Sequence, residues 1–170
     1  MIHKVIRKQY NSHMCFVCGI DNHAGLHTDF YELDGKKLIA IFKGHDIHQS
    51  YPKRMHGGII AALLDETIGR AIQIEEDGIW GVTVEISIKY HKPVPLDQEL
   101  RVVGYITNNR RLLFEGEGYL YDLNQEVLAT CTAKYMKQSV YSIINDEDFE
   151  EEKWIFVDDQ DLPQVFELPR

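Results

Sequence analysis

Residues Met55 to Ile74 read MHGGIIAALLDETIGRAIQI, and this stretch decides the fold. Apolar side chains recur along it at intervals of three and four residues, which is the spacing of one helix face. These side chains are Ile59, Ile60, Leu63, Leu64, Ile68 and Ile72. The pattern predicts a long amphipathic helix whose apolar face covers a sheet.

A second face of the same helix carries small residues around one acid. Its members are Gly58, Ala61, Ala62, Asp65 and Gly69. Glycine inside a helix costs about 1 kcal/mol relative to alanine, so Gly69 indicates a close approach by another part of the molecule. Arg70 lies four residues after Glu66, and this spacing predicts an ion pair on the helix surface. Asp65 has no basic residue at such a spacing. We expect burial to raise the pKa of Asp65.

The front of the helix, His56-Gly57-Gly58, leaves backbone N–H groups unpaired at the positive end of the helix dipole, which suits an oxyanion. Asp65 lies eight residues after Gly57, or about 12 Å along the helix axis. Reacting groups must approach within about 3 Å, so one copy of the helix cannot hold both groups at one carbonyl. Either the two groups are unrelated, or a second chain completes the site.

The bulk composition predicts one soluble globular domain. The chain has 170 residues, of which 44% are hydrophobic and 26% charged. The net charge of -9 argues against a nucleic-acid-binding protein, and most of it lies in residues 141–170. No apolar run reaches the roughly 18 residues of a membrane span, and the first residues lack the apolar core of a signal peptide. With three cysteines, an odd number, the expected location is cytoplasmic.

Strand patterns flank the helix. Residues 26–33 and 38–43 predict a hairpin joined by Asp34-Gly35, and residues 1–14 predict a basic arm or a first helical turn. Four further strands are predicted over residues 80–92, 99–107, 112–121 and 127–137. The first of these alternates cleanly, with one face formed by Val82, Val84, Ile86, Ile88 and Tyr90. One helix covers only one face of an antiparallel sheet, so we expect an α+β domain whose uncovered face or edge takes a partner.

Two groups of potential metal ligands have alternative interpretations. Cys15 and Cys18 could form a zinc knuckle or a redox pair, or could pack beneath a turn, and a lone Cys-x-x-Cys favours the packed pair. A zinc knuckle would be completed by His13, His23 or His27. The second group has spacings that match no closed ligand set and comprises His45, His48 and His56. We interpret these as solvated loop residues and expect no metal.

The helix start His56-Gly57-Gly58 is followed, nine residues after the histidine, by Asp65 within Leu64-Asp65-Glu66. Three further pieces accompany these, namely Cys15-Phe16-Val17-Cys18-Gly19, Asn22 with Gly25-Leu26, and Tyr90-His91-Lys92-Pro93-Val94. Together they resemble the hotdog-fold acyl-CoA thioesterases of the phenylacetic-acid and 4-hydroxybenzoyl-CoA thioesterase superfamily. The resemblance runs over about residues 15 to 138.

The resemblance implies a hotdog fold within residues 1–140, with one long central helix packed on a curved antiparallel sheet of five to six strands. Residues 141–170 lie outside the resemblance. They are acidic but keep several apolar residues, so we expect an extension that docks in part, and these residues are Trp154, Ile155, Phe156, Val157, Val165, Phe166 and Leu168. The resemblance also implies a homodimer, alone or as a dimer of dimers, whose subunits pair their sheets edge to edge and share each active site. No cofactor is implied, and no nucleic-acid or membrane partner.

By position, the resemblance assigns catalytic roles to five residues. The backbone N–H of Gly57 would polarise a thioester carbonyl, and Asp65 of the other chain would act as general base or nucleophile. Thr83 would help to hold the water, and Gln49 would supply a side-chain amide. His56 would bond the backbone at the start of the helix.

For substrate binding, the resemblance points to Gly58 beside the carbonyl and to Lys92 and Arg54 at the phosphates of coenzyme A. The expected reaction is hydrolysis of an acyl-CoA thioester to a free acid and coenzyme A. The alternative is a non-catalytic hotdog module that binds acyl-CoA, although a carboxylate among small residues favours the enzyme. A hotdog dehydratase fits less well, because His45 and His48 lack the expected spacing to the helix acid.

Overall fold

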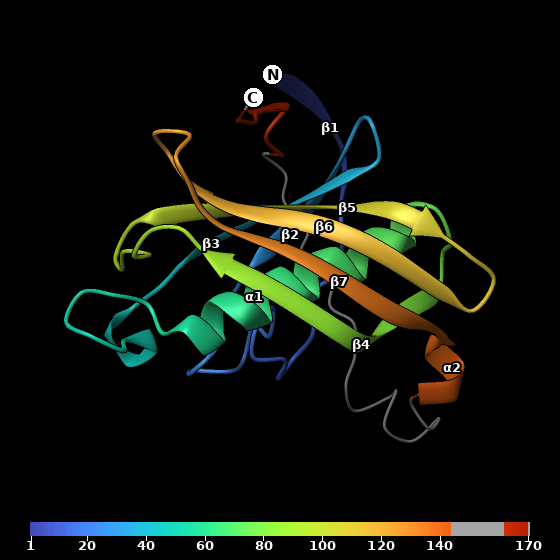
Figure 1. Ribbon diagram of the computed structural model, residues 1–170, viewed down its shortest axis with the longest axis horizontal. Coiled ribbons are helices and arrows are strands. Elements are labelled where there is room, and N and C mark those ends of the chain that lie inside the picture. The colour runs from blue at the N-terminus through green and yellow to red at the C-terminus, as the bar shows by residue number, and fades with distance from the viewer. Residues whose placement is uncertain (144–161, 170) are drawn as a thin grey trace.

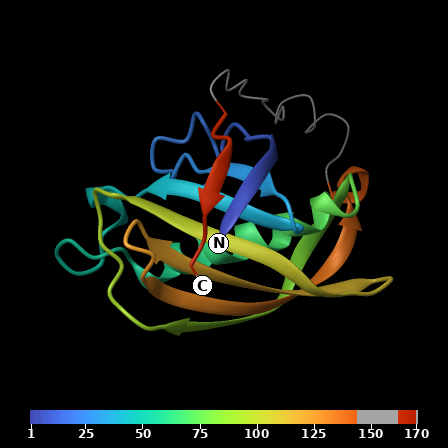
Figure 2. The same cartoon turned by 90° about the horizontal axis from the view of Figure 1, so that it is seen from above.

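The computed structural model describes residues 1–143 and 162–169. Its longest helix, α1, spans Gly57–Arg70 and continues as the 3-10 turn η2 over Ala71–Ile74, as the apolar spacing predicted. The helix lies along one face of a single curved sheet, which Figure 1 and Figure 2 show from two directions. No helix in the described ranges is long and apolar enough to cross a membrane.

The sheet has eight strands in the order β4-β7-β6-β5-β3-β2-β1-β8, and neighbouring strands are antiparallel. Their bounds are β1 Ile2–Lys8, β2 Asp29–Leu33, β3 Lys37–Lys43, β4 Ile79–Tyr90, β5 Glu99–Asn109, β6 Leu113–Asp122, β7 Val127–Ser139 and β8 Val165–Glu167. The short helices η1 and α2 cover Asp46–His48 and Val140–Ile143. All six predicted strands are present, but the expected total of five to six was too low because β1 and β8 extend the sheet beyond β2.

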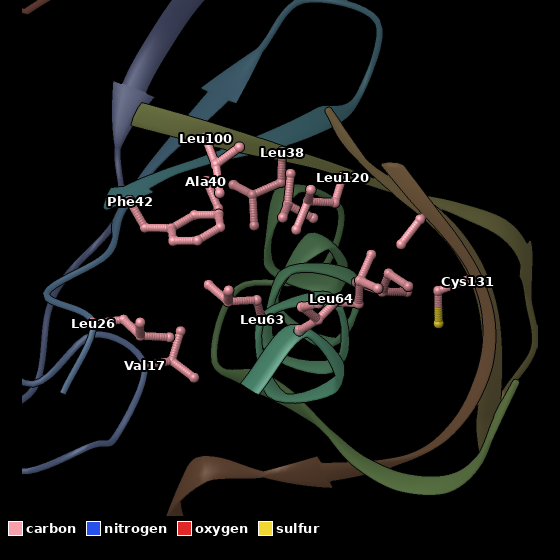
Figure 3. Packing of buried hydrophobic residues seen from close by; sticks show 14 of the residues in the cluster. Val17, Leu26, Leu38, Ala40, Phe42, Leu63, Leu64, Leu100, Leu120 and Cys131 are labelled. Carbon is pink, nitrogen blue, oxygen red and sulfur yellow. The ribbon is translucent and has the colours of Figure 1, made fainter. Parts of the chain in front are cut away.

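The apolar stripe of α1 forms the centre of the main core. Leu63 and Leu64 are fully buried, and Figure 3 shows them between Leu120 of β6 and two residues of the 9–28 loop, Val17 and Leu26. The helix is therefore enclosed between the sheet and this loop. That enclosure fixes which helix residues remain near the surface, and Asp65 is one of them.

The prediction for residues 1–14 was wrong, because strand β1 replaces the basic arm or helical turn. Its charged side chains pair with acids on the neighbouring strand β2. Arg7 bonds Glu32 at 2.8 Å, and the buried Lys8 bonds Asp29 at 2.9 Å. These ion pairs take the place of the apolar alternation that marks a half-buried strand in sequence, so hydrophobic periodicity did not reveal β1.

Strand β4 departs from the predicted clean alternation at a β-bulge that follows Thr83. Thr83 lies opposite Tyr135 across the ladder and faces α1, and Ile86 shares this face although it is three residues further on. Val82 and Val84 were predicted to share one face with Ile86, but the bulge breaks that face, because Val82 pairs with Met136 and Ile86 pairs with Ala133. The bulge therefore directs a hydroxyl group, Thr83, toward the helix.

A second apolar cluster lies outside the helix-bearing core and includes the end of the described chain. Phe166 of β8 and Leu168 are buried with Tyr31, Ile39 and Val103 of the sheet. The apolar tail residues Trp154, Ile155, Phe156 and Val157, expected to help dock the acidic extension, lie outside the described residues. The contacts of Phe166 and Leu168 attach the chain end to the sheet.

Candidate functional site

The N-terminus of α1 presents one backbone N–H group that has no acceptor in the described parts of the chain, and it belongs to Gly57. His56 precedes the helix, and its Nδ1 accepts the N–H of Gly58 at 2.9 Å. The carbonyl oxygen of His56 accepts from Ile59 and Ile60. His56 thus bonds backbone and occupies the Gly58 donor, whereas the Gly57 donor stays available to a ligand oxygen.

Tyr90 supports the same end of the helix from β4. Its hydroxyl donates to the carbonyl oxygen of Gly57 at 2.8 Å, and its side chain is 51% exposed. The sequence placed Tyr90 on a strand face but gave no sign of this bond, because the bond joins residues 33 positions apart. The contact holds the Gly57 peptide in place beside the strand.

The loop before α1 folds back beside the helix N-terminus. Gln49 and Met55 form an isolated β-bridge, two residues before Gly57. Gln49 is exposed, and its Oε1 accepts the N–H of Lys53 at 2.8 Å. Its side-chain NH2 group can still donate to a ligand, so the structure brings Gln49 to the same end of the helix as Gly57.

The prediction of solvated loop histidines was wrong for His48, which is buried. Its Nδ1 accepts the N–H of His45 at 3.0 Å, and its Nε2 donates to the carbonyl oxygen of Ala24 at 3.0 Å. Both ring nitrogens therefore hold the loop together, and His48 has no ring nitrogen left for a metal.

Asp65 lies at the other end of the candidate site, half-buried and bonded to β4. Its Oδ1 accepts the hydroxyl of Thr83 at 2.8 Å. Burial raises the pKa of Asp65, while the hydrogen bonds from Thr83 and Tyr135 oppose the rise. The Tyr135 hydroxyl also donates to the Asp65 carbonyl oxygen at 3.0 Å. The raised pKa confirms the expectation from the sequence and suits a carboxylate that takes a proton.

A small open cavity begins at Asp65. Its lining residues are Asp65, Glu66, Gly69, Arg70, Gln73, Trp80, Gly81 and Tyr135. Gly69 is needed for close packing, as predicted, because a Cβ atom there would lie 3.2 Å from Cε1 of Tyr135. Tyr135 was missed in sequence, although it ends the alternating face of β7 that meets the helix.

The structure brings the predicted residues together as two half-sites on one helix. Gly57 lies at the first position of α1, together with Gln49 from the preceding loop, and Asp65 lies eight positions later, together with Thr83. The straight helix separates these half-sites by about 12 Å. A single chain therefore does not place Gly57 and Asp65 at one carbonyl.

The predicted phosphate contacts have different surroundings. Lys92 forms an ion pair with Glu126, so its charge is already partly balanced. Arg54 is exposed and forms an isolated β-bridge with Pro95. Both lie in the chain segments that flank the Gly57 end of the helix.

Glu66 and Arg70 form the predicted ion pair, 2.7 Å between Oε1 and Nε, but the pair is not on the surface. Arg70 is 6% exposed beneath the 9–28 loop. Among the described residues, one group of side chains that could ligate a metal lies close together, and it consists of Cys15, Cys18 and Glu66. His13, His23 and His27 do not join them. The favoured interpretation placed both cysteines beneath the turn, and the structure buries Cys18 there but leaves Cys15 partly exposed.

Part of the chain is similar to known thioesterases. Residues 53–129 match the model of the thioesterase superfamily. Acyl-coenzyme A thioesterase 13 of Mus musculus is 30% identical over 78 residues, which make up 46% of this chain and 56% of the mouse protein. The chain thus spans about half the length of this curated relative.

Solved structures share the fold. A thioesterase superfamily protein aligns with a TM-score of 0.67 and 22% identity, over 72% of this chain and 59% of its own. A Bacillus halodurans protein solved with CoA aligns with a TM-score of 0.54 and 28% identity, over 59% of this chain and 66% of its own. The expected hotdog fold is confirmed.

The bond from Thr83 to Asp65 predicts a graded effect on the pKa of Asp65. Thr83→Val removes the hydroxyl that stabilises the carboxylate, so the pKa of Asp65 should rise further, whereas Thr83→Ser should restore it. Carbon NMR of the carboxyl group across a pH titration measures both variants. Equal midpoints in wild type and Thr83→Val would contradict the described contact.

Proposed function

We propose that this chain, whose residues 53–129 form a thioesterase superfamily domain in a hotdog fold, hydrolyses an acyl-CoA thioester to a free acid and coenzyme A. One observation carries the proposal: the carboxyl group of Asp65, with its raised pKa and its bond to Thr83, shares a helix with the unbonded N–H of Gly57. The mouse relative is named an acyl-CoA thioesterase, and the Bacillus halodurans neighbour was solved with CoA. Both support this substrate class.

The chemistry requires a base and an oxyanion donor. With Asp65 as general base, a water oxygen bonds the carbonyl carbon while Asp65 takes the water proton, and the N–H of Gly57 stabilises the resulting oxyanion. The C–S bond then breaks, and the leaving thiolate of coenzyme A takes the proton from Asp65. With Asp65 as nucleophile, its carboxylate bonds the carbonyl carbon and the C–S bond breaks, which releases the coenzyme A thiolate and leaves an anhydride. Water then hydrolyses the anhydride to the free acid and the Asp65 carboxylate, and the thiolate takes the proton that is released. An oxyanion donor of this kind contributes on the order of 3 kcal/mol.

If Gly57 and Asp65 act on one carbonyl, the length of helix between them requires that they come from different chains. In the described part of the chain, β4 pairs with β7 on one side and has no strand on the other. This edge is 12 residues long and exposes apolar side chains that include Val82 and Val84. Such an edge is a template for another strand. On our proposal, β4 of a second copy pairs here and places its Asp65 at the Gly57 end of the first.

Coenzyme A would extend outward from the Gly57 end. Arg54 is three residues before Gly57 and exposed, and Lys92 is two residues after Tyr90, which contacts Gly57. Arg54 is the stronger candidate for a phosphate contact, because Lys92 already pairs with Glu126. Gln49 would donate its NH2 group beside the thioester.

A non-catalytic acyl-CoA-binding module explains Asp65 less well. Burial disfavours the ionised form of the Asp65 carboxyl group, so keeping an acid at this position costs folding free energy. Binding of an apolar acyl chain gives no reason for that cost. A base, in contrast, gains proton affinity from the same burial.

Asp65→Asn tests the base. The variant should lose at least about a hundredfold in turnover, since general base catalysis typically contributes 10² to 10⁴. Folding raises the pKa of Asp65, so its ionisation above that pKa disfavours the folded state. The uncharged Asn avoids this effect, and the variant should not melt at a lower temperature than the wild type at pH 7. Hydrolysis assays over short, medium, long and aryl acyl-CoAs, with thermal unfolding as control, measure both effects. Full activity of the variant would sink the assignment of Asp65 as base or nucleophile, whereas a wild type that binds acyl-CoA without turnover would favour the binding module.

Gly57→Pro tests the oxyanion donor. Proline is favoured at the first helical position, and His56 before it is already extended, so the substitution removes the N–H with little other change. Turnover should fall by roughly 10² to 10³. Gly57→Ala is the matched control, because it adds a Cβ at 3.6 Å from Tyr90 but keeps the N–H. Its turnover should fall far less than that of Gly57→Pro. Equal losses in the two variants would mean that bulk, not the donor, decides activity.

Val84→Lys tests the proposed dimer edge. A lysine at a free edge opposes strand pairing, so the variant should sediment as a monomer and lose turnover, while the wild type sediments as a dimer. Val165→Lys is the control, because Val165 is 50% exposed on β8 at the opposite edge of the sheet. A wild-type monomer with full activity would be incompatible with a shared site.

A further inference from the structure

A cluster that the proposed hydrolysis does not use lies between the 9–28 loop and α1. The sulfur atoms of Cys15 and Cys18 and a carboxylate oxygen of Glu66 all lie within 4.8 Å of one another. Cys18 is fully buried, and Cys15 is partly exposed. Two thiols this close can be joined by a disulfide without a large backbone change.

Arg70 gives one of the two thiols an anionic character. Its Nη2 donates to the sulfur of Cys18 at 3.0 Å and its Nε donates to Glu66 at 2.7 Å. A guanidinium stays charged in a protein, and this one is buried, so it favours an anion at each bonded position. The hydrogen bond from Cys15, followed by the charge of Arg70, lowers the pKa of Cys18. The pKa of Cys15 is raised. Cys18 is therefore the thiolate, and Cys15 remains a thiol.

The backbone holds Cys15 against Cys18. The N–H of Gly19 donates to the carbonyl oxygen of Cys15 at 2.8 Å, which closes one helical turn and puts both side chains on one side. A Cβ atom on Gly19 would lie 2.4 Å from that oxygen, so only glycine closes the turn this tightly. The sulfur of Cys15 also accepts the N–H of Val17 at 3.3 Å. These bonds keep a thiol beside the thiolate.

A metal ion fits this cluster poorly. Arg70 already bonds the sulfur of Cys18 and the carboxylate of Glu66, which would be two of the ligands. Its positive charge stands where a cation would have to bind. No histidine in the described residues supplies a fourth ligand.

We propose that Cys15 and Cys18 form a peroxide-reactive dithiol that closes reversibly to a disulfide. The Cys18 thiolate attacks one peroxide oxygen, the O–O bond breaks, and the leaving hydroxide takes a proton to become water. The sulfur of Cys15 then attacks the sulfenic acid on Cys18, the S–S bond forms, and the expelled hydroxide leaves with the Cys15 proton as a second water. Two thiols thus supply the two electrons that reduce one peroxide. A thiol reductant reopens the bond.

The burial of Cys18 selects the oxidant. Cys18 has no exposed surface, and the neighbouring Cys15 is partly exposed. Hydrogen peroxide, which is close to water in size, can therefore reach the pair more readily than a bulky disulfide such as oxidised glutathione. The reaction of the pair is independent of thioester hydrolysis.

The test is a count of thiols after exposure to hydrogen peroxide. The full chain is treated, the peroxide is removed with catalase, and the protein is unfolded in an alkylating reagent for peptide mass analysis. The wild type has three cysteines and should lose two alkylatable thiols, with Cys15 joined to Cys18 and Cys131 still free. Dithiothreitol should restore all three. Cys131→Ser, which removes a buried cysteine outside the cluster, should form the same disulfide.

Two single variants assign the roles. Cys15→Ser should still be oxidised at Cys18, to sulfenic or sulfinic acid, because the thiolate remains but the second thiol is gone. Cys18→Ser should leave Cys15 unoxidised at the same peroxide dose. Three alkylatable thiols in the treated wild type would overturn the proposal, and so would preferential oxidation of Cys15 in Cys18→Ser. One zinc ion per purified chain, lost in Cys15→Ser, would also overturn it, since the thiolates would then be ligands.

Discussion

The fixed rise of an α-helix is the constraint on which the rest of the structure depends. It separates Gly57 from Asp65 by about 12 Å on α1, so these two groups of one chain cannot act on the same thioester carbonyl. Strand β4 holds both positions, through Tyr90 at the carbonyl of Gly57 and Thr83 at the carboxylate of Asp65. The same strand has a free edge in the described part of the chain. On our proposal, one strand therefore positions both half-sites and joins the two chains that complete them.

The electrostatic surroundings of Asp65 are consistent with a base. Arg70 lines the same cavity, yet its guanidinium is bonded to Glu66 and Cys18 and does not form an ion pair with Asp65. An ion pair would lower the pKa of Asp65 and weaken it as a base. Burial instead raises this pKa, and the hydroxyl of Thr83 orients the carboxylate. The buried ion cluster around Arg70 thus keeps its charge away from the proposed catalytic group.

The helix, the six strands β2 to β7 and the candidate residues on them were predictable because their signals are local. Hydrophobic spacing fixed α1, and the glycines and Asp65 stood out within it. Features that depend on distant partners were not predictable. Strand β1 is stabilised by ion pairs to β2, Arg70 is buried by a loop some 60 residues earlier in the chain, and the bulge that follows Thr83 leaves no mark in the alternation. The contact of Thr83 with Asp65 needed the fold, because the bulge decides which face Thr83 occupies.

The most direct measurement mixes two inactive chains. Gly57→Pro and Asp65→Asn chains, each carrying a different affinity tag, are co-expressed, and the heterodimer is isolated through both tags. If Gly57 of one chain and Asp65 of the other form each site, the heterodimer has one intact site of two and should recover about half of the wild-type turnover, although each parent homodimer is inactive. A heterodimer as inactive as its parents would contradict the shared site, because one Gly57 and one Asp65 from different chains would then not make an active site.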